Sequence, residues 1–516
     1  MQCSILVRHM KMNKIRSCFH GALIWGSVLI TAAFIIIITQ KTKIGNFFDE
    51  SSEIWSHSSP KIDRSPTFTN LQVIDQIEQY VPSLPIGLWE KYKDRFYNNV
   101  TCVKYPYVYY LKFNNNFWQV LDTSSGIFYL YAAYYDNRTL SRIGPSVRIL
   151  AMVDRVDPNV IIYCQMWFQN IKEPVVVKVA KYNYIWHKSW GSPGPGDLHP
   201  YLMTCPIPRE YRNEVPDSVG IVEEKCDMSS NNLRVIYKKP EKKKDFAVCV
   251  KGLDFPYQDV SVRLIEWIEL LKVLGADKII FYQYQVHQNI SKVLKFYQEE
   301  GNVDVVPITL PGYQPNIPGL QHEYLKDHSF RILRNEPIHF NDCLYKNLYS
   351  YKYIVLMDSD EVIMPKKESS WEGLLHSLSP GKIKDSYYVQ NVYFFDDLRQ
   401  HGWTEEIPQY MHMLQHVYRS RNFTMPGHYI KAFHDPERIL TLHNHFPVEC
   451  LGPQCDTYAI ATDVAQLQHY RADCVGELME VCDEYKNNIV KDATIWRFKN
   501  ILVNRVSATL NKLGYF

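Results

Sequence analysis

The sequence lacks several features that would point to a specialised class of protein. Neither charge is in excess, because 57 Lys and Arg residues face 55 Asp and Glu residues, for a formal net charge of +2. No basic field therefore favours nucleic acid as a partner. With 46% hydrophobic and 22% charged residues, the chain is not a disordered protein, a collagen or a small disulfide scaffold. Its 516 residues exceed one core of about 250–300 residues, so we expect two folded units.

The spacing of the cysteines is a second absence. No two cysteines form a CxxC pair, so a zinc ribbon or a thioredoxin-like redox site has no support. No internal repeat is found either. Ten cysteines follow residue 100, and this even number permits disulfides in an oxidising compartment. Cys450 and Cys455 flank a short loop suited to one disulfide; the other pairings stay open, with buried free thiols as an alternative.

Long uncharged runs are also rare, with one exception near the N-terminus. Residues 21–39 (GALIWGSVLITAAFIIIIT) carry no charge and at ~1.5 Å per residue nearly span a hydrocarbon core of ~30 Å. A cleaved signal peptide is the alternative, but Lys41 and Lys43 follow directly and leave no small-residue cleavage site. Basic residues at 8, 11, 14 and 16 keep the N-terminus cytosolic. We therefore expect a single-pass type II membrane protein.

The rest of the chain divides by its pattern. Residues 40–95 are rich in Ser and Pro and read as a stem, whereas short aromatic or β-branched runs from residue 96 predict a β-rich unit. The sequon asparagines all follow the uncharged segment, in modest support of a luminal location: Asn99, Asn137, Asn289 and Asn422. The expected organisation is a cytosolic tail (1–20), a transmembrane anchor (21–39), a stem (40–95), a β-rich domain (96–240) and a catalytic domain (241–516).

Strands and helices alternate in the last of these regions. Strands are expected at 246–251, 278–284 and 303–308, and helices at 260–275, where Gly275 suits the C-terminal cap, and at 289–300. Asn341 or Asp342 would cap a further helix to residue 350, followed by a strand over 351–357. This βαβαβ pattern predicts a parallel α/β sheet.

The strand over 351–357 ends at Asp358-Ser-Asp360-Glu361. The carboxyl end of a buried parallel strand lies at the crevice where α/β folds bind ligands. Two Asp separated by one residue suit a hard cation such as Mg²⁺ or Mn²⁺, which would bridge the phosphates of a nucleotide-sugar. A surface turn is the plainer alternative. Behind a type II anchor, the motif is typical of a Golgi glycosyltransferase.

Several blocks of sequence resemble glycosyltransferase family 92, formerly domain of unknown function 23. The blocks occur in the family's order and are specific only jointly: Trp267-Ile-Glu-Leu, Leu274-Gly-Ala-Asp-Lys-Ile-Ile-Phe-Tyr, Phe340-Asn-Asp-Cys-Leu-Tyr, Asp358-Ser-Asp-Glu-Val-Ile-Met-Pro, Lys431-Ala-Phe-His-Asp-Pro and His469-Tyr-Arg. The similarity covers about residues 245–475, and residues 147–168 resemble the stretch upstream.

The resemblance implies a GT-A fold that uses a divalent metal, Mn²⁺ or Mg²⁺, and a UDP-sugar donor. Known members are largely inverting β-1,4-galactosyltransferases that use UDP-galactose. One group modifies fucose on N-glycan cores and another extends plant galactan. The resemblance thus predicts a Golgi galactosyltransferase with a luminal catalytic domain and a glycoprotein glycan as acceptor.

Residue roles follow from the motifs and from the resemblance together. Asp358 and Asp360 are expected to bind the metal and the diphosphate, with Glu361 supporting them. In GT-A enzymes a late histidine often adds a ligand, and His443 and His445, which would share one face of a strand, are the first candidates. His469 ranks below them. The remaining donor-binding candidates are Lys251, Asp342 and Lys431. Each also has a plain structural interpretation.

The general base is expected in the acidic loop FFDDLRQHGWTEEIP, and Trp403 in that loop would stack on an acceptor sugar. The loop offers four candidates without a family motif to choose among them: Asp396, Asp397, Glu405 and Glu406. A structural acidic loop with a buried Trp is the alternative.

Two other functions stay open at this stage. The chain could be a membrane-tethered, lectin-like protein on an inactive GT-A frame, although the intact Asp pair favours an enzyme. A different donor, UDP-GlcNAc or UDP-glucose, is the weaker alternative, because the sequence does not distinguish between hexoses.

Overall fold

The β-rich region predicted from residue 96 forms one ten-stranded sheet in the computed structural model. The model describes residues 77–92 except 79, and residues 102–516 except 188–189, 191–193, 195, 328, 379–380, 402–403 and 475. The strands are β1 (Phe113–Asn115), β2 (Trp118–Thr123), β3 (Gly126–Asp136), β4 (Ser146–Val153), β5 (Tyr163–Trp167), β6 (Val175–Lys178), β7 (Lys181–Tyr184), β8 (His199–Pro206), β9 (Ser218–Val222) and β10 (Leu233–Ile236). Their order is β6-β5-β9-β10-β3-β4-β8-β7, with β2 and β1 joined through β3.

A second sheet carries the predicted α/β pattern. Its first part consists of β11 (Lys244–Phe255), α4 (Ser261–Leu274), β12 (Lys278–Val286), α5 (Gln288–Glu299), β13 (Val303–Pro307), α6 (Leu320–Asp327), α7 (Ser329–Asn347) and β14 (Tyr351–Met357). Four strands run parallel in the order β13-β12-β11-β14. Gly275 ends α4 with a positive φ of 109°, as its place after the last apolar residue predicts.

The chain beyond β14 extends this sheet and builds a smaller one. Its elements are β15 (Glu361–Pro365), α8 (Trp371–Ser377), β16 (Ser386–Val389), β17 (Asn391–Phe395), η5 (Asp396–His401), α9 (His412–Gln415), β18 (Tyr418–Ser420), β19 (Lys431–His434), β20 (Ile439–Leu442), β21 (Pro447–Cys450), β22 (Thr457–Ala459), β23 (Ala465–Arg471), α10 (Cys482–Asn487), β24 (Ile489–Lys491) and α11 (Lys499–Lys512). Strands β19, β16 and β22 continue the α/β sheet, and β15, β23 and β17 form the three-stranded sheet.

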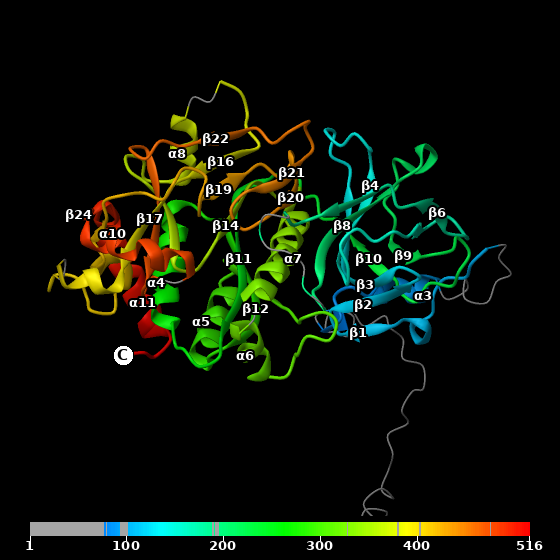
Figure 1. Cartoon of the computed structure of the whole chain (residues 1–516), viewed down its shortest axis with the longest axis horizontal. Helices are drawn as coiled ribbons and strands as arrows, with labels where there is room; N and C mark the ends of the chain where they lie inside the picture. Colours follow the sequence, from blue (N-terminus) through cyan, green and yellow to red (C-terminus); the bar gives the residue numbers. More distant parts are fainter. Residues whose placement is uncertain are drawn as a thin grey trace, which may run out of the picture. The chain divides into compact units, whose positions relative to one another are not determined.

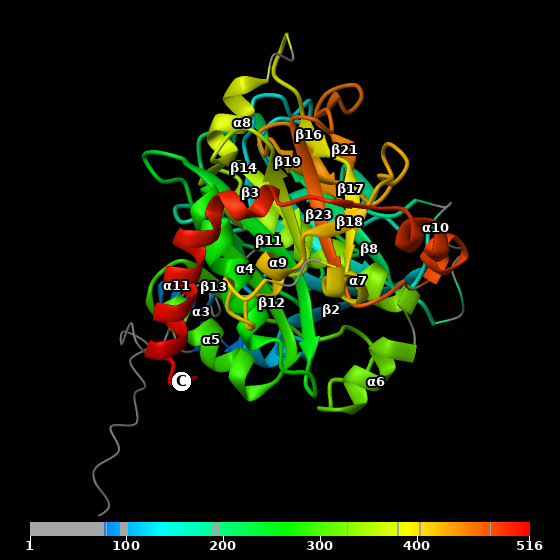
Figure 2. The same cartoon turned by 90° about the vertical axis from the view of Figure 1, so that its left-hand side faces the viewer.

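Both faces of the parallel sheet are covered, as its apolar strands require. Phe246, Val248 and Val250 of β11 pack in a core with α4, α5 and α11. Ala247 and Cys249, which alternate with them, face a second core that contains α7 and residues of β3 and β4. Figure 1 shows α7 between the two large sheets, and Figure 2 shows α4 beside α11. The predicted boundary at residue 240 falls between β10 and β11, within one compact unit of residues 70–516.

Helix α7 differs from its prediction. Asn341 and Asp342 do not cap it; they lie near its C-terminal end, and the helix starts at Ser329. The amide of Asn341 bonds to both backbone groups of Leu442, the N–H at 2.9 Å and the carbonyl at 2.8 Å. The two polar side chains are therefore used for tertiary packing, which no local sequence signal reveals.

The cysteines that follow residue 100 are all paired. The disulfides are Cys102–Cys226, Cys164–Cys205, Cys249–Cys343, Cys450–Cys455 and Cys474–Cys482. The pair expected from the short loop, Cys450–Cys455, is confirmed. Five disulfides are typical of domains that fold in the secretory pathway.

The expected membrane anchor at residues 21–39 lies outside the described residues. In the part of the chain that the structure describes, no helix combines the length and the apolar character needed to cross a bilayer.

Candidate functional site

The acidic motif forms a tight turn between β14 and β15. The backbone N–H of Glu361 donates to the carbonyl of Asp358 at 3.1 Å, and the N–H of Asp358 donates to Glu361 Oε2 at 3.1 Å. Glu361 is buried, whereas the Asp360 side chain is 48% exposed. Glu361 thus holds the turn, as expected, and the two aspartates are presented at the end of β14.

Two lysines on the strands that flank β14 meet this turn. Lys251 on β11 places Nζ 3.3 Å from Asp358 Oδ2, and Lys431 on β19 places Nζ 3.4 Å from the same oxygen. Lys431 is fully buried and also lies 3.2 Å from Glu361 Oε2. Burial alone would raise the pKa of Asp358, but the two lysines outweigh it and hold that pKa well below its usual range. Asp358 is therefore a carboxylate near neutral pH.

His469 is a histidine that the fold brings into contact with the acidic turn. Strand β23 pairs with β15 so that His469 lies opposite Glu361. Its Nε2 is 3.5 Å from Asp360 Oδ2, and its Nδ1 is 3.5 Å from Glu361 Oε1. Burial raises the pKa of Glu361. Burial also acts to raise the pKa of Asp360, but the interaction with His469 outweighs it, so that the pKa of Asp360 lies below its usual value. The fold thus brings His469 into contact with the motif, and His445 also lies near enough to Asp358 to help lower its pKa.

A cavity of about 380 Å³ opens at this point. It lies between the end of β11, the start of α4, the acidic turn and the end of β23, and six polar residues of its lining are Lys251, Arg263, Asp358, Asp360, His469 and Arg471. Asp358 Oδ1 is buried and has no hydrogen-bond partner among the described residues. A carboxylate oxygen of this kind is a ligand that a hard divalent cation prefers. The residues present therefore fit a Mg²⁺ or Mn²⁺ ion at Asp358 and Asp360.

The structure places His443 and His445 differently from the prediction. Both follow β20 in the turn before β21, so no strand alternation puts them on one face. The His443 ring lies 4.1 Å from that of Trp190, between centroids, and His445 Nδ1 donates to the Ile430 carbonyl at 3.1 Å. Burial lowers the pKa of His443 to about 4 and that of His445 to about 3. Neither is among the residues that line the cavity.

Asp342, which is expected to bind the donor, is not among the residues that line the cavity. Its carboxylate is fully buried and accepts hydrogen bonds from the hydroxyls of Tyr282, at 2.6 Å, and Tyr134. Lys346, one turn later, lies 2.7 Å from it. The residue ties α7 to β12 and to β3.

None of the four carboxylates proposed as general base is among the described residues that line the cavity. Asp397 lies 2.8 Å from Lys486, and Glu406 lies 3.2 Å from Lys499 at the surface. Glu405 is exposed. Asp396 is half-buried and contacts Arg263, whose side chain does line the cavity, at 3.4 Å. Trp403 lies outside the described residues.

Sequence reasoning missed Glu336, which lies within α7. Its Oε1 is 3.6 Å from Lys251 Nζ. Its Oε2 is buried and has no hydrogen-bond partner in the part of the chain that the structure describes, and burial raises the pKa of the carboxyl group. The residue precedes Pro337 in a helix whose start the sequence did not reveal, so no motif marked it. Asn444, whose side-chain oxygen accepts from Lys431 at 2.5 Å, was also missed, because the motif drew attention only to the histidines on either side of it.

The comparisons with known proteins agree with the position of this site. The family model described as Glycosyltransferase family 92 matches residues 244–505, just over half of the chain. The match begins at β11, extends into α11 and contains every residue around the acidic turn. No curated protein matches the chain.

Proposed function

The chain belongs to glycosyltransferase family 92, and we propose that it transfers galactose from UDP-galactose, with inversion and a β-1,4 linkage, to a glycan acceptor such as fucose on N-glycan cores. The observation that carries the proposal is the cavity at the acidic turn. There Asp358 and Asp360 lie at the end of a parallel strand, with Lys251 on the neighbouring strand.

Donor binding is assigned to the residues of this turn. A divalent cation, Mn²⁺ or Mg²⁺, would be held by Asp358 and Asp360 and would offset the negative charge of the diphosphate. Lys251 and the fully buried Lys431 together keep Asp358 ionised. Lys251, which is 38% exposed on its side chain and lines the cavity, is placed to meet a phosphate oxygen. His469 orients the Asp360 carboxylate from the other side.

The proposed location is the Golgi membrane, with residues 21–39 as the anchor and the catalytic domain in the lumen. Five disulfides support an oxidising compartment. The uncharged run after a basic N-terminal tail supports the type II orientation.

A donor screen tests the proposal. The purified full-length chain is incubated with Mn²⁺, a fucosylated N-glycan and UDP-galactose, UDP-glucose or UDP-GlcNAc in turn, and the product linkage is determined by NMR. We expect transfer from UDP-galactose that is lost on chelation and in Asp358→Asn and Asp360→Asn. Asp483→Asn, which changes an exposed carboxylate on α10, is the matched control and should keep full activity.

The outcomes separate the parts of the proposal. Full activity in EDTA would overturn the metal requirement, and preference for another UDP-sugar would overturn the assignment of the donor. A folded chain that binds glycans but shows no UDP binding by calorimetry would replace the enzyme with a lectin-like protein.

A further inference from the structure

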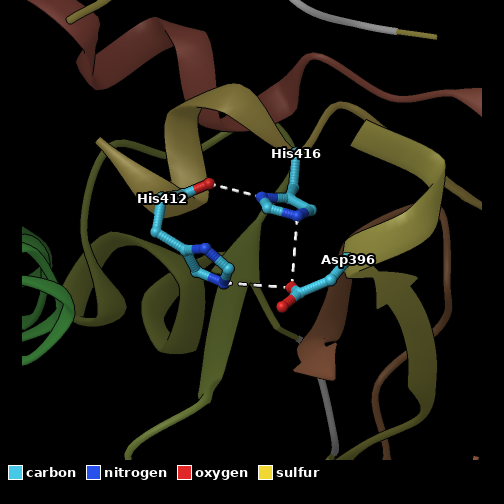
Figure 3. A group of neighbouring side chains, drawn as sticks. All are labelled: Asp396, His412 and His416. Atoms are coloured by element: carbon cyan, nitrogen blue, oxygen red, sulfur yellow. Dashed lines mark hydrogen bonds and ion pairs between the residues drawn. The ribbon is translucent and has the colours of Figure 1, made fainter. Parts of the chain in front are cut away.

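A cluster of three metal-ligating side chains lies apart from the acidic turn. Asp396 begins η5, and His412 and His416 lie at the start and just past the end of the short helix α9. Figure 3 shows both imidazoles directed at one carboxylate oxygen. His412 Nε2 is 3.5 Å from Asp396 Oδ1, and His416 Nε2 is 3.3 Å from it. The three ligand atoms all lie within 4.8 Å of one another.

In its neutral form, the His416 ring turns a nitrogen without a proton toward the carboxylate. His416 Nδ1 lies 2.5 Å from the carbonyl oxygen of His412, and a carbonyl only accepts, so Nδ1 carries the hydrogen. In the neutral ring Nε2 then holds a lone pair. That lone pair faces Asp396 Oδ1, a second acceptor, and among the described residues neither of these buried atoms has an aligned hydrogen-bond partner. Two hydrogen-bond acceptors at this distance repel each other, so that either a cation lies between them or His416 is a charged imidazolium.

The distances favour a shared cation. Zinc binds histidine nitrogen at ~2.0–2.1 Å and carboxylate oxygen at ~2.0–2.2 Å, so the edges of a tetrahedron of such ligands measure about 3.3–3.5 Å. The separations of Asp396 Oδ1 from the two Nε2 atoms, 3.5 and 3.3 Å, are of this length. A hydrogen-bonded imidazolium would place the nitrogen closer, at ~2.7–2.9 Å from the oxygen.

The cluster is also held in place by a second layer of contacts. Glu266 on α4 is fully buried and accepts the backbone N–H groups of Met413, at 2.9 Å, and Leu414, at 3.1 Å. These bonds fix the first turn of α9 and so the positions of the two histidines. The side chains of His412 and His416 are 8% and 1% exposed, and that of Asp396 is 29% exposed. The ligands are therefore preorganised and partly open on one side.

We propose that Asp396, His412 and His416 bind one Zn²⁺ ion, at a site separate from the acidic turn. Two histidines and one carboxylate leave a fourth position for water or for another ligand, as in zinc sites with three protein ligands. The ion joins η5 to α9 behind the cavity wall, where Arg263 contacts Asp396 and the ring of Tyr470 lies 6.2 Å from both histidine rings. This assignment removes Asp396 from the candidates for general base, because a metal-bound carboxylate oxygen is a poor proton acceptor.

Zinc content tests the proposal without any activity assay. The full-length chain is stripped with a chelator, equilibrated with Zn²⁺ in excess Mg²⁺, separated from free metal and analysed by mass spectrometry. We expect the unaltered chain to retain one more zinc per molecule than His416→Gln, His412→Gln or Asp396→Asn. His376→Gln, which changes an exposed histidine of α8, is the matched control and should keep the zinc content of the unaltered chain.

Cobalt gives a second readout of the same site. Co²⁺ bound by two histidines and a carboxylate absorbs visible light more strongly than hydrated Co²⁺, and the spectrum should be lost in the three cluster variants. Circular dichroism shows which variants are folded. If His416→Gln does not fold, Asp396→Asn is compared instead, because Asp396 is partly exposed. The zinc site would be overturned if the unaltered chain and a folded cluster variant retained equal amounts of zinc, or if no protein retained zinc. The contact with Asp396 would then be made by a charged imidazolium of His416. Neither result depends on the donor or on catalysis.

Discussion

His469 Nε2 lies 3.5 Å from Asp360 Oδ2, across the pairing of β23 with β15. More than a hundred residues separate the two side chains in sequence. The pairing register alone brings them together, because a shift of one residue would turn His469 to the opposite face of the three-stranded sheet. The histidine therefore belongs to the acidic turn by topology.

Replacement of His469 by Ala is expected to weaken Mn²⁺ binding at the turn by about 10–100-fold, because the residue orients a proposed ligand. The dissociation constant can be measured by titration of Mn²⁺ with electron paramagnetic resonance. His428→Ala removes an exposed histidine and should change nothing. Unaltered Mn²⁺ affinity in a folded His469→Ala protein would contradict the role.

Replacement of Lys431 and replacement of Lys251 are expected to affect different properties, the first mainly stability and the second mainly UDP binding. Lys431→Met leaves buried Asp358 and Glu361 uncompensated and should lower the free energy of unfolding by about 3–5 kcal/mol. Lys251→Met should cost less stability, because Lys251 is partly exposed, but should raise the Kd of UDP about tenfold. Urea unfolding and calorimetry measure the two effects. The reverse pattern would show that the roles are exchanged.

The stabilisation that each disulfide gives is expected to grow with the logarithm of the length of the loop that it closes. Cys249–Cys343 joins β11 to α7 across 94 residues, whereas Cys450–Cys455 spans only 5. In the chain-entropy model these loops correspond to about 4.7 and about 2 kcal/mol. Paired Cys→Ala variants, unfolded with urea without reductant, test the ratio. An equal loss from both would argue against an entropic origin.

The raised pKa of Glu266 predicts that its contribution to stability decreases as the pH rises. Burial raises its pKa to about 7 from 4.5, although backbone N–H groups of α9 oppose the shift. Because the pKa is higher in the folded state than in the unfolded state, protonated Glu266 contributes to the free energy of unfolding. This contribution is complete below about pH 4.5 and is lost as the pH rises through about 7.

The free energy of unfolding of the unaltered chain, minus that of Glu266→Gln, should therefore fall by up to about 3 kcal/mol between pH 5 and pH 8. Buried histidines titrate alike in both proteins, so their effects cancel in this difference. Urea unfolding at several pH values measures it. A difference that does not change with pH would show that Glu266 is ionised throughout.

Local pattern and motif were enough for much of the fold. The parallel strands and α4 were predicted from apolar periodicity and from Gly275, because these signals act over a few residues. The acidic turn was found from sequence because both aspartates directly follow one strand. The sequence predicts His443 and His445 on one face of a strand, whereas the chain makes a turn there, because nothing local marks the end of β20. The start of α7 was misplaced because its polar residues serve tertiary contacts.

The sequence by itself determined the family, the parallel α/β pattern and the position of Asp358 and Asp360 at the end of a strand, because each depends on neighbours in the chain. Only the tertiary structure decided which cations and which histidine meet those carboxylates. Lys251, Lys431 and His469 come from three separate strands, and their meeting depends on strand order and register. The same holds for Asp396 and the histidines of α9, whose contact was invisible until η5 and α9 were packed together.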